Sequence, residues 1–189
     1  MIKKYLSILL SFYFLTACTS AVEEEYTYFG GKIINPKSDY VSLHSQDQLI
    51  DSIPINKHGK FLGKIKDLQE GLYYFVHGNE NQHVYLEPKD SLMLRLNTWD
   101  FDESIVFTGK GSERNNLLID CFLEEENERT NFYQLYKLDP QEFRSKLDEL
   151  ILEKQETFNE FVETHPDETT GYRNVLQVAL TYPLYSNLE

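Results

Sequence analysis

Residues 104–123 read SIVFTGKGSERNNLLIDCFL, and the hydrophobic pattern of the chain changes within this stretch. In its first part the apolar residues form a short run, as in a β-strand, whereas in its second part they recur every three to four residues, as on one face of a helix. Gly109 and Gly111 tolerate the positive φ of a tight corner, and Ser112 is a typical N-cap residue. The stretch therefore predicts a corner between a strand and a helix that runs from about Glu113 to Glu128.

Glycines ahead of a helix can also hold an anion at the helix N-terminus. This stretch lacks the Gly-Lys-Ser/Thr ending of a P-loop and the three-glycine spacing of a dinucleotide site. We therefore favour a corner with a structural role over an anion site.

The chain before the corner has the pattern of a sheet protein. Tyr40, Ser42 and His44 alternate with Val41 and Leu43, and turn-forming residues separate one short run from the next. Short strands with turns at this spacing are typical of an antiparallel sandwich. The predicted strands are Tyr26 to Ile34, Tyr40 to His44, Leu49 to Ile55, Lys60 to Ile65, Leu72 to His77, His83 to Leu86, Ser91 to Asn97 and Ser104 to Phe107.

The chain after the corner has a helical period. Asp139 followed by Pro140 indicates an N-cap and a proline at the first helical position. This helix should end at His165, and a third helix should run from about Thr170 to Ala179 and be closed by Pro183. An apolar stripe marks the buried face of the second helix; it consists of Phe143, Leu147, Leu150, Ile151, Phe158 and Phe161.

Strands followed by helices predict an α+β fold, in which an antiparallel β-sandwich over residues 26–110 precedes a helical segment over residues 111–189. The apolar content is 41% and the aromatic content 14%, which is enough for a packed core.

The N-terminus has the pattern of a secretory signal peptide over residues 1–17. Lys3 and Lys4 precede an apolar run that ends at Leu15, which is shorter than the roughly 20 residues of a membrane span. Two interpretations fit this pattern: an ordinary signal peptide followed by an incidental cysteine, or the signal peptide of a lipoprotein.

The sequence Leu15-Thr16-Ala17-Cys18 resembles the lipobox of bacterial lipoproteins. The resemblance implies cleavage after Ala17, a thioether lipid on Cys18 and acylation of the new amine, for example with palmitate. More than one acyl chain gives stable membrane binding. We expect a lipoprotein anchored to the lipid bilayer of the cell envelope, facing the periplasm or the cell surface, with residues 18–25 as a tether.

The formal net charge is −13, and removal of the two lysines with the signal peptide makes the mature chain more acidic still. Nucleic acids and anionic lipid surfaces repel such a protein, so a nucleic-acid partner is not expected.

The chain has two cysteines, and lipidation of Cys18 leaves Cys121 without a partner. Cys121 lies in an apolar helical context, where a free cysteine packs as a small hydrophobic residue. We expect it to be buried and inert.

Candidate sites of chemistry are few. His77 and His83 flank a turn, so a hairpin could bring them together, but no third ligand has a recognisable spacing, and no metal site is expected. Glu124 to Glu126 predict a solvated helix face. No Ser-His-Asp, Gly-x-Ser-x-Gly or Cys-x-x-Cys pattern occurs, so we assign no catalytic residue and no cofactor.

Several turns together resemble the N-terminal β domain of Bacteroidota-type thioredoxin-like thiol–disulfide oxidoreductase lipoproteins, over roughly residues 26 to 185. The segments that carry the resemblance are DSIPINKHGKF (51–61), EGLYYF (70–75), YLEPKDSL (85–92), FTGKGSERNN (107–116) and Tyr182-Pro183.

The resemblance implies a thioredoxin domain with Trp-Cys-x-x-Cys after the helices, and no such pair occurs up to Glu189. We expect either a fragment of an oxidoreductase or a stand-alone copy of its accessory part. In both cases the chain as given is a non-catalytic accessory region, whose partner is a thioredoxin-like domain or another periplasmic protein.

A stand-alone glycan- or peptide-binding lipoprotein is the alternative. Trp99 and Phe101 lie in a predicted loop, where exposed rings could stack on a sugar; rings that cap the sandwich core are the competing explanation. A purely structural role, as a spacer or a dimerising platform that holds a partner off the membrane, is a third interpretation.

Overall fold

The computed structural model describes residues 25–186, apart from the side chains of residues 127–131 and Ser186. Cys18 and the signal peptide lie outside the described residues. The anchor and its lipid therefore stay predictions.

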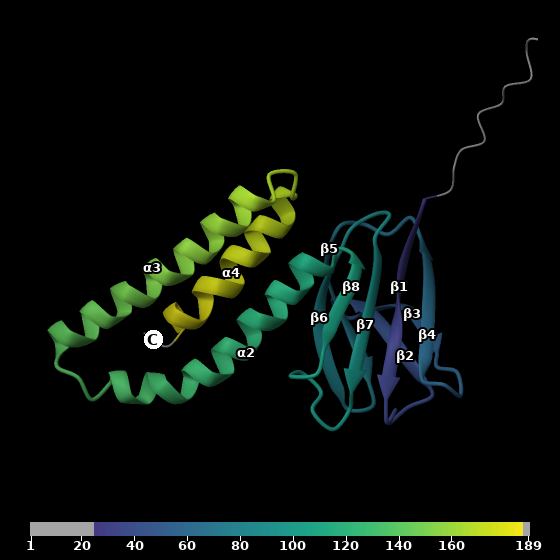
Figure 1. The fold of residues 1–189 in the computed structure, drawn as a ribbon, viewed down its shortest axis with the longest axis horizontal. Helices are drawn as coiled ribbons and strands as arrows, with labels where there is room; N and C mark the ends of the chain where they lie inside the picture. The colour runs from purple at the N-terminus through teal and green to yellow at the C-terminus, as the bar shows by residue number, and fades with distance from the viewer. Residues whose placement is uncertain (1–24, 187–189) are drawn as a thin grey trace, which may run out of the picture.

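Two four-stranded sheets form the N-terminal half of the described chain (Figure 1). Their strands are β1 (Tyr26–Ile34), β2 (Tyr40–Ser45), β3 (Gln48–Pro54), β4 (Lys60–Lys66), β5 (Gly71–His77), β6 (Glu80–Leu86), β7 (Ser91–Asn97) and β8 (Val106–Lys110). One sheet has the order β4-β1-β7-β8 and the other β3-β2-β5-β6. The α+β class with a β-sandwich is confirmed, and the predicted strands fall within a few residues of the observed ones.

One strand pair departs from the antiparallel pattern. β1 and β7 run parallel, with Tyr28 opposite Ser91. The two strands approach closely at Gly31, where a Cβ would lie 2.0 Å from the carbonyl oxygen of Leu94. Because the whole second sheet separates β1 from β7 in the sequence, no local pattern indicates this pairing.

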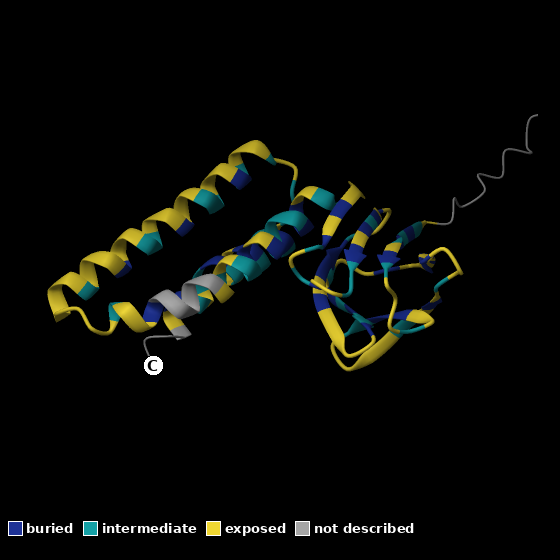
Figure 2. Cartoon of the chain, turned by 60° about the horizontal axis from the view of Figure 1, so that its bottom comes forward, coloured by how far each residue is buried: buried dark blue, intermediate teal, exposed yellow. Residues whose placement is uncertain are grey.

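The inner faces of the two sheets enclose the main core. Phe29 packs against Phe61 and Phe75, with ring centroids 5.8 and 5.7 Å apart. Buried residues alternate with exposed ones along the strands (Figure 2), as the period of two requires.

Three helices follow: α2 (Ser112–Leu135), α3 (Pro140–Thr164) and α4 (Thr170–Ser186). α4 lies between α2 and α3 and contacts both (Figure 1), while α2 packs against β8 and β6. Within residues 25–186, none of the helices is apolar over the length that a membrane crossing needs.

The start of α3 is confirmed, since Asp139 Oδ1 accepts the backbone N–H groups of Gln141 and Glu142 at 2.9 and 3.0 Å. Its end before His165 is confirmed as well.

The start of α2 is a corner as predicted, but Ser112 does not cap it. Gly111 occupies the N-cap position in the left-handed region, with φ +93°, and no side chain caps the helix. α2 also runs past the predicted end to Leu135, because Phe132 is buried against Leu147 and Leu184 in a separate apolar cluster.

The prediction that Pro183 closes the last helix is wrong. α4 continues to Ser186 with Pro183 inside it. Beyond the first turn of a helix, a proline removes one N–H donor and its ring crowds the carbonyl group four residues earlier, so packing has to hold the helix together there. Leu180 and Leu184 are buried on either side of Pro183, and their packing holds the last turn in place.

Candidate functional site

Two consecutive asparagines at the start of α2 bind the outer edges of both sheets. The Asn115 side chain accepts the Tyr85 N–H at 2.7 Å and donates to the Tyr85 carbonyl at 2.9 Å. Asn116 makes the same pair of bonds with Phe107, at 2.9 and 3.1 Å. Because Tyr85 lies on β6 and Phe107 on β8, α2 pairs backbone groups of edge strands in both sheets. Unpaired edge groups invite association with other chains, and this clamp removes two such positions.

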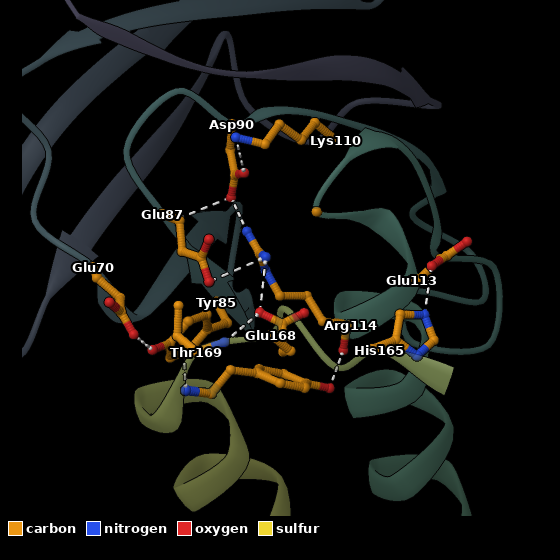
Figure 3. Close-up of polar contacts among 12 residues, drawn as sticks. Glu70, Tyr85, Glu87, Asp90, Lys110, Glu113, Arg114, His165, Glu168 and Thr169 are labelled. Carbon is orange, nitrogen blue, oxygen red and sulfur yellow. Dashed lines mark hydrogen bonds and ion pairs between the residues drawn. The ribbon is translucent and has the colours of Figure 1, made fainter. Parts of the chain in front are cut away.

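A cluster of charged side chains lies beside this asparagine clamp, and we name Glu87, Asp90, Arg114 and Glu168 the junction cluster (Figure 3). Arg114 comes from the first turn of α2, Glu87 and Asp90 from the turn between β6 and β7, and Glu168 from the connection between α3 and α4. The guanidinium is paired with Asp90 through Nη2 and lies 3.2 Å from Glu87 and 3.3 Å from Glu168 through Nη1. Arg114 and Asp90 are buried.

The junction cluster holds three carboxyl groups against one guanidinium. Burial raises the pKa of Glu87, and its hydrogen bond with Glu168 acts in the same direction, whereas the Arg114 charge opposes both. Burial also works against the charge of Arg114, but the attraction of the carboxylates outweighs it and raises the pKa of the guanidinium. Lys110 Nζ, 3.9 Å from Asp90, supplies a further positive charge at the exposed side.

The turn that carries the two acids is shaped around this ion pair. Asp90 Oδ2 accepts the backbone N–H of Glu87 at 2.9 Å. At Gly111, a Cβ would lie 3.0 Å from both Asp90 Oδ2 and Arg114 Nη2, and φ is +93°. Glycine therefore meets two requirements there, the corner and the space for the ion pair.

α4 is bonded to the first turn of α2, because the Tyr172 hydroxyl donates to the Arg114 carbonyl at 2.7 Å. Next to this contact, the Tyr85 hydroxyl of β6 donates to Glu70 at 2.5 Å. This second bond lowers the pKa of Glu70, with a smaller effect from Thr169. A Cβ on Gly171 would lie 2.4 Å from the Tyr85 hydroxyl, so glycine permits the close approach of α4.

The arrangement joins three segments around a side chain that is 6% exposed, and so it fixes the helices to the sandwich. Arg114 and Glu168 also line a cavity of about 230 Å³ beside the start of α2, together with Lys110, Glu113 and His165. Local sequence patterns did not predict the junction cluster, because charged residues such as Arg114 and Glu168 are usually exposed. Residues 70, 90 and 114–116 lie within the segments 70–75, 85–92 and 107–116, which the sequence comparison singled out without indicating their contacts.

The two histidines that flank the predicted hairpin do not come together. His83 on β6 lies opposite Tyr74, three positions away from His77. His77 is buried and is bound to the Lys37 N–H at 2.9 Å and to the Tyr40 carbonyl at 3.1 Å. Among the residues that the structure describes, no three His, Cys, Asp or Glu side chains are grouped as a metal site requires.

Trp99 and Phe101 have different surroundings. Trp99 is 73% exposed, whereas Phe101 is 7% exposed and stacks on Phe75 in the core, with ring centroids 6.0 Å apart. They do not form a shared aromatic platform, because one of the two rings belongs to the core.

The burial of Cys121 is confirmed. Its side chain is 7% exposed, and burial, with a contribution from Glu124, raises the pKa of the thiol to about 12. The prediction of a solvated face over Glu124 to Glu126 does not describe Glu124 fully. Its carboxylate accepts a 2.8 Å hydrogen bond from the buried Lys154 of α3.

No family model matches this chain, and no curated protein is similar to it. Among solved structures, a DUF3823 family protein from Parabacteroides merdae ATCC 43184 has 12% sequence identity with it and a TM-score of 0.27. The similarity covers 46% of this chain and 48% of that protein, about half of each. A likeness of this size identifies neither family nor function, so the sequence resemblance to thioredoxin-associated domains stays a prediction.

Proposed function

We propose that this chain is a lipid-anchored accessory protein of the bacterial cell envelope, which holds a partner near the membrane and performs no chemistry of its own. The lipobox-like sequence that ends in Cys18 supports the anchor. The junction cluster and the asparagine clamp tie helices and sandwich together through buried bonds, and this gives a partner one rigid body to bind.

The state of Cys121 is the observation that carries the non-catalytic part of the proposal. Disulfide exchange needs a thiolate that can reach its substrate. Cys121 is buried, and its pKa of about 12 keeps the thiol protonated at neutral pH. In keeping with the family resemblance, the redox pair would belong to the partner, a thioredoxin-like domain or another periplasmic protein.

Cys18→Ser should release the protein from the membrane, because the thioether lipid forms on that thiol and a serine cannot carry it. Membrane fractionation followed by a carbonate wash measures the effect. Cys121→Ser is the matched control and should stay in the membrane fraction. Sedimentation of Cys18→Ser with washed membranes would contradict the anchor.

A maleimide should label Cys121 in the native lipoprotein far more slowly than after denaturation in guanidinium, because burial suppresses the thiolate. We expect the two labelling rates to differ by a factor on the order of 100 or more. Mass spectrometry measures the labelled fraction, and Cys121→Ala supplies the unlabelled control. The same protein should reduce insulin disulfides no faster than dithiothreitol alone. Reduction of insulin disulfides by the wild type that is absent in Cys121→Ala would contradict the proposal that the chain is non-catalytic.

Glycan or peptide binding is the second candidate function, and the exposure of Trp99 favours it. The burial of Phe101 leaves this candidate with one ring of the expected pair. We therefore place it behind the accessory role.

A further inference from the structure

The two sheets of the sandwich differ in charge. The strands β4, β1, β7 and β8 contain no aspartate or glutamate, and their basic residues are Lys32, Lys60, Lys64, Lys66, Arg95 and Lys110. The strands β2, β3, β5 and β6 contain no lysine or arginine, but they include Asp51 and Glu80. In a chain with a net charge of −13, positive charge is therefore concentrated on one sheet.

These six basic residues lie on the outer face of their sheet, and we name them the basic face. The buried residues of the same strands, such as Phe61, Leu94 and Phe107, point to the core, and the basic residues stand at the alternate, exposed positions. The helices contact the sandwich at β5, β6 and β8 and lie to one side of it (Figure 1). Within the described chain, no helix covers the basic face.

Three like charges lie side by side in one row of this face. Lys60 on β4 is opposite Lys32 on β1, and Lys32 is opposite Arg95 on β7. Directly opposed like charges destabilise a sheet. Within residues 25–186, none of the three forms an ion pair with a carboxylate, whereas Lys110 at the rim lies 3.9 Å from Asp90. The fold gains nothing from this row, but a surface with several negative charges would neutralise it.

The remainder of the basic face suits contact with lipid headgroups. Lys64 Nζ lies 3.6 Å from the centre of the Tyr26 ring, and Tyr28 is opposite Lys64. Leu62 lies between Lys60 and Lys64 along β4 and is 60% exposed. Tyrosine rings are enriched where a protein meets the membrane–water interface, because the ring is apolar and its hydroxyl stays in water.

The position of the tether selects the membrane among anionic occupants. Cys18 precedes Tyr26, the first residue of β1, by eight positions (26 minus 18), which reach at most about 28 Å when fully extended. Since β1 belongs to the basic sheet, an anchored Cys18 keeps this face close to the headgroups at a high effective concentration. Charges act over about 8 Å at physiological salt, so the acids of α3, which extends away from the sandwich (Figure 1), do not cancel the attraction.

We propose that the basic face lies on the anionic headgroups of the membrane that holds the anchor. The repulsion expected from the net charge then acts on the acidic helices, while the lysines and the arginine of the sheet are attracted. This contact turns the sheet β3-β2-β5-β6 away from the membrane, toward a partner. The inference rests on the proposed function, because the lipid on Cys18 brings the face to the bilayer.

Lysine labelling tests the proposal in the lipidated protein. Nanodiscs are made of phosphatidylcholine, or of an equal mixture of phosphatidylcholine and phosphatidylglycerol, and the protein in them is acetylated with N-hydroxysuccinimidyl acetate. Mass spectrometry measures the rate at each lysine. Lys32, Lys60 and Lys64 should react about threefold or more slowly in the anionic nanodiscs, the factor expected when about two thirds of the molecules are docked. Lys137, outside the basic face, should react equally in both. The difference should vanish in about 1 M salt, where the screening length is about 3 Å.

Lys32→Glu places an acid between Lys60 and Arg95, an arrangement that a sheet favours. It should remove the protection of Lys60 and Lys64. Lys146→Glu is the matched control, because it makes the same change of charge at a lysine of α3 whose side chain is 55% exposed, and it should leave the protection unchanged. Lys60→Gln is a second variant, which should reduce the protection of Lys32 and Lys64 and which keeps the test decisive if circular dichroism shows Lys32→Glu to be unfolded.

Equal labelling of Lys32, Lys60 and Lys64 in the two kinds of nanodisc would overturn the proposal. Equal loss of protection in Lys32→Glu and Lys146→Glu would overturn it as well, since the attraction would then depend on net charge alone. Protection by soluble polyglutamate, without protection by phosphatidylglycerol, would assign the face to an acidic protein instead. Each of these results leaves the anchor and the inert thiol standing. A protein that does not enter nanodiscs through Cys18 would instead remove the proposed function, and this inference with it.

Discussion

Arg114→Met should lower the free energy of unfolding by about 3–5 kcal/mol, the usual cost of removing one partner from a buried ion pair. The variant keeps most of the buried apolar volume of the side chain but leaves Asp90, Glu87 and Glu168 facing one another without the guanidinium. Asp90 is fully buried and cannot regain its lost partner from water. Urea unfolding followed by far-UV circular dichroism measures the change.

Arg144→Met is the matched control. Arg144 pairs with Asp148 on the surface of α3, with side-chain exposures of 74% and 52%. A pair of this kind contributes about 0–1 kcal/mol, so the control should unfold close to the wild type. Equal effects of the two substitutions would show that the junction cluster does not hold the helices to the sandwich.

The difference between Arg114→Met and wild type should also shrink as the pH falls. Burial already raises the pKa of Glu87, and without the guanidinium the protonated carboxyl is favoured further in the folded state. A carboxyl whose folded pKa lies above its unfolded pKa costs stability where it is ionised, and this cost disappears as the pH falls through the folded pKa. The gap measured near neutral pH should therefore exceed the gap measured at about pH 5, and a gap that widened would contradict the carboxylate mechanism.

Asn115→Asp should cost on the order of 3 kcal/mol, although it changes a single amide group to a carboxylate. Asn115 is 1% exposed and donates to the carbonyls of Tyr85 and Gly111, at 2.9 and 2.8 Å. Aspartate keeps the bond from the Tyr85 N–H, but it loses both donated bonds and places a negative charge against two buried carbonyl oxygens. Urea unfolding measures the loss, and hydrogen exchange at the Tyr85 amide should stay slow in the folded fraction.

Asn116→Asp is the matched control, since Asn116 makes the equivalent pair of bonds with Phe107 at a half-buried position. Water can replace part of the lost bonding there, so we expect a cost nearer 1 kcal/mol. A larger effect at Asn116 than at Asn115 would show that burial does not set the energetics of the clamp.

Local patterns predicted most of the fold, and the misses have a common cause. Alternation and turn residues placed the strands, and Asp139 with Pro140 placed the start of α3. The parallel pairing of β1 with β7, the extension of α2 to Phe132 and beyond, and the continuation of α4 through Pro183 all depend on contacts far apart in the sequence. Such contacts override local propensity and leave no periodic signal.

The candidate site was harder to predict for the same reason. Arg114 becomes a buried residue because the β6–β7 turn and the α3–α4 connection bring three acids to it. The sequence pattern of Asn115 and Asn116 indicates only a polar first turn of a helix, since the edge strands they bind are defined by the tertiary fold. The burial of Cys121 was predictable, because apolar residues surround it along the helix.

The position of β1 determines how the protein responds to a mechanical load. Any pull on the chain from its N-terminal side enters the described fold at Tyr26, the first residue of β1. β1 is an inner strand, held along Tyr26–Lys32 by β4 and along Tyr28–Ile34 by β7. A force along its axis loads both rows of hydrogen bonds in shear, so many must break together rather than one after another. A tether at this end would therefore transmit tension to the most firmly held strand of its sheet, and thermal movement of a membrane would turn the domain as a unit before it opened the fold.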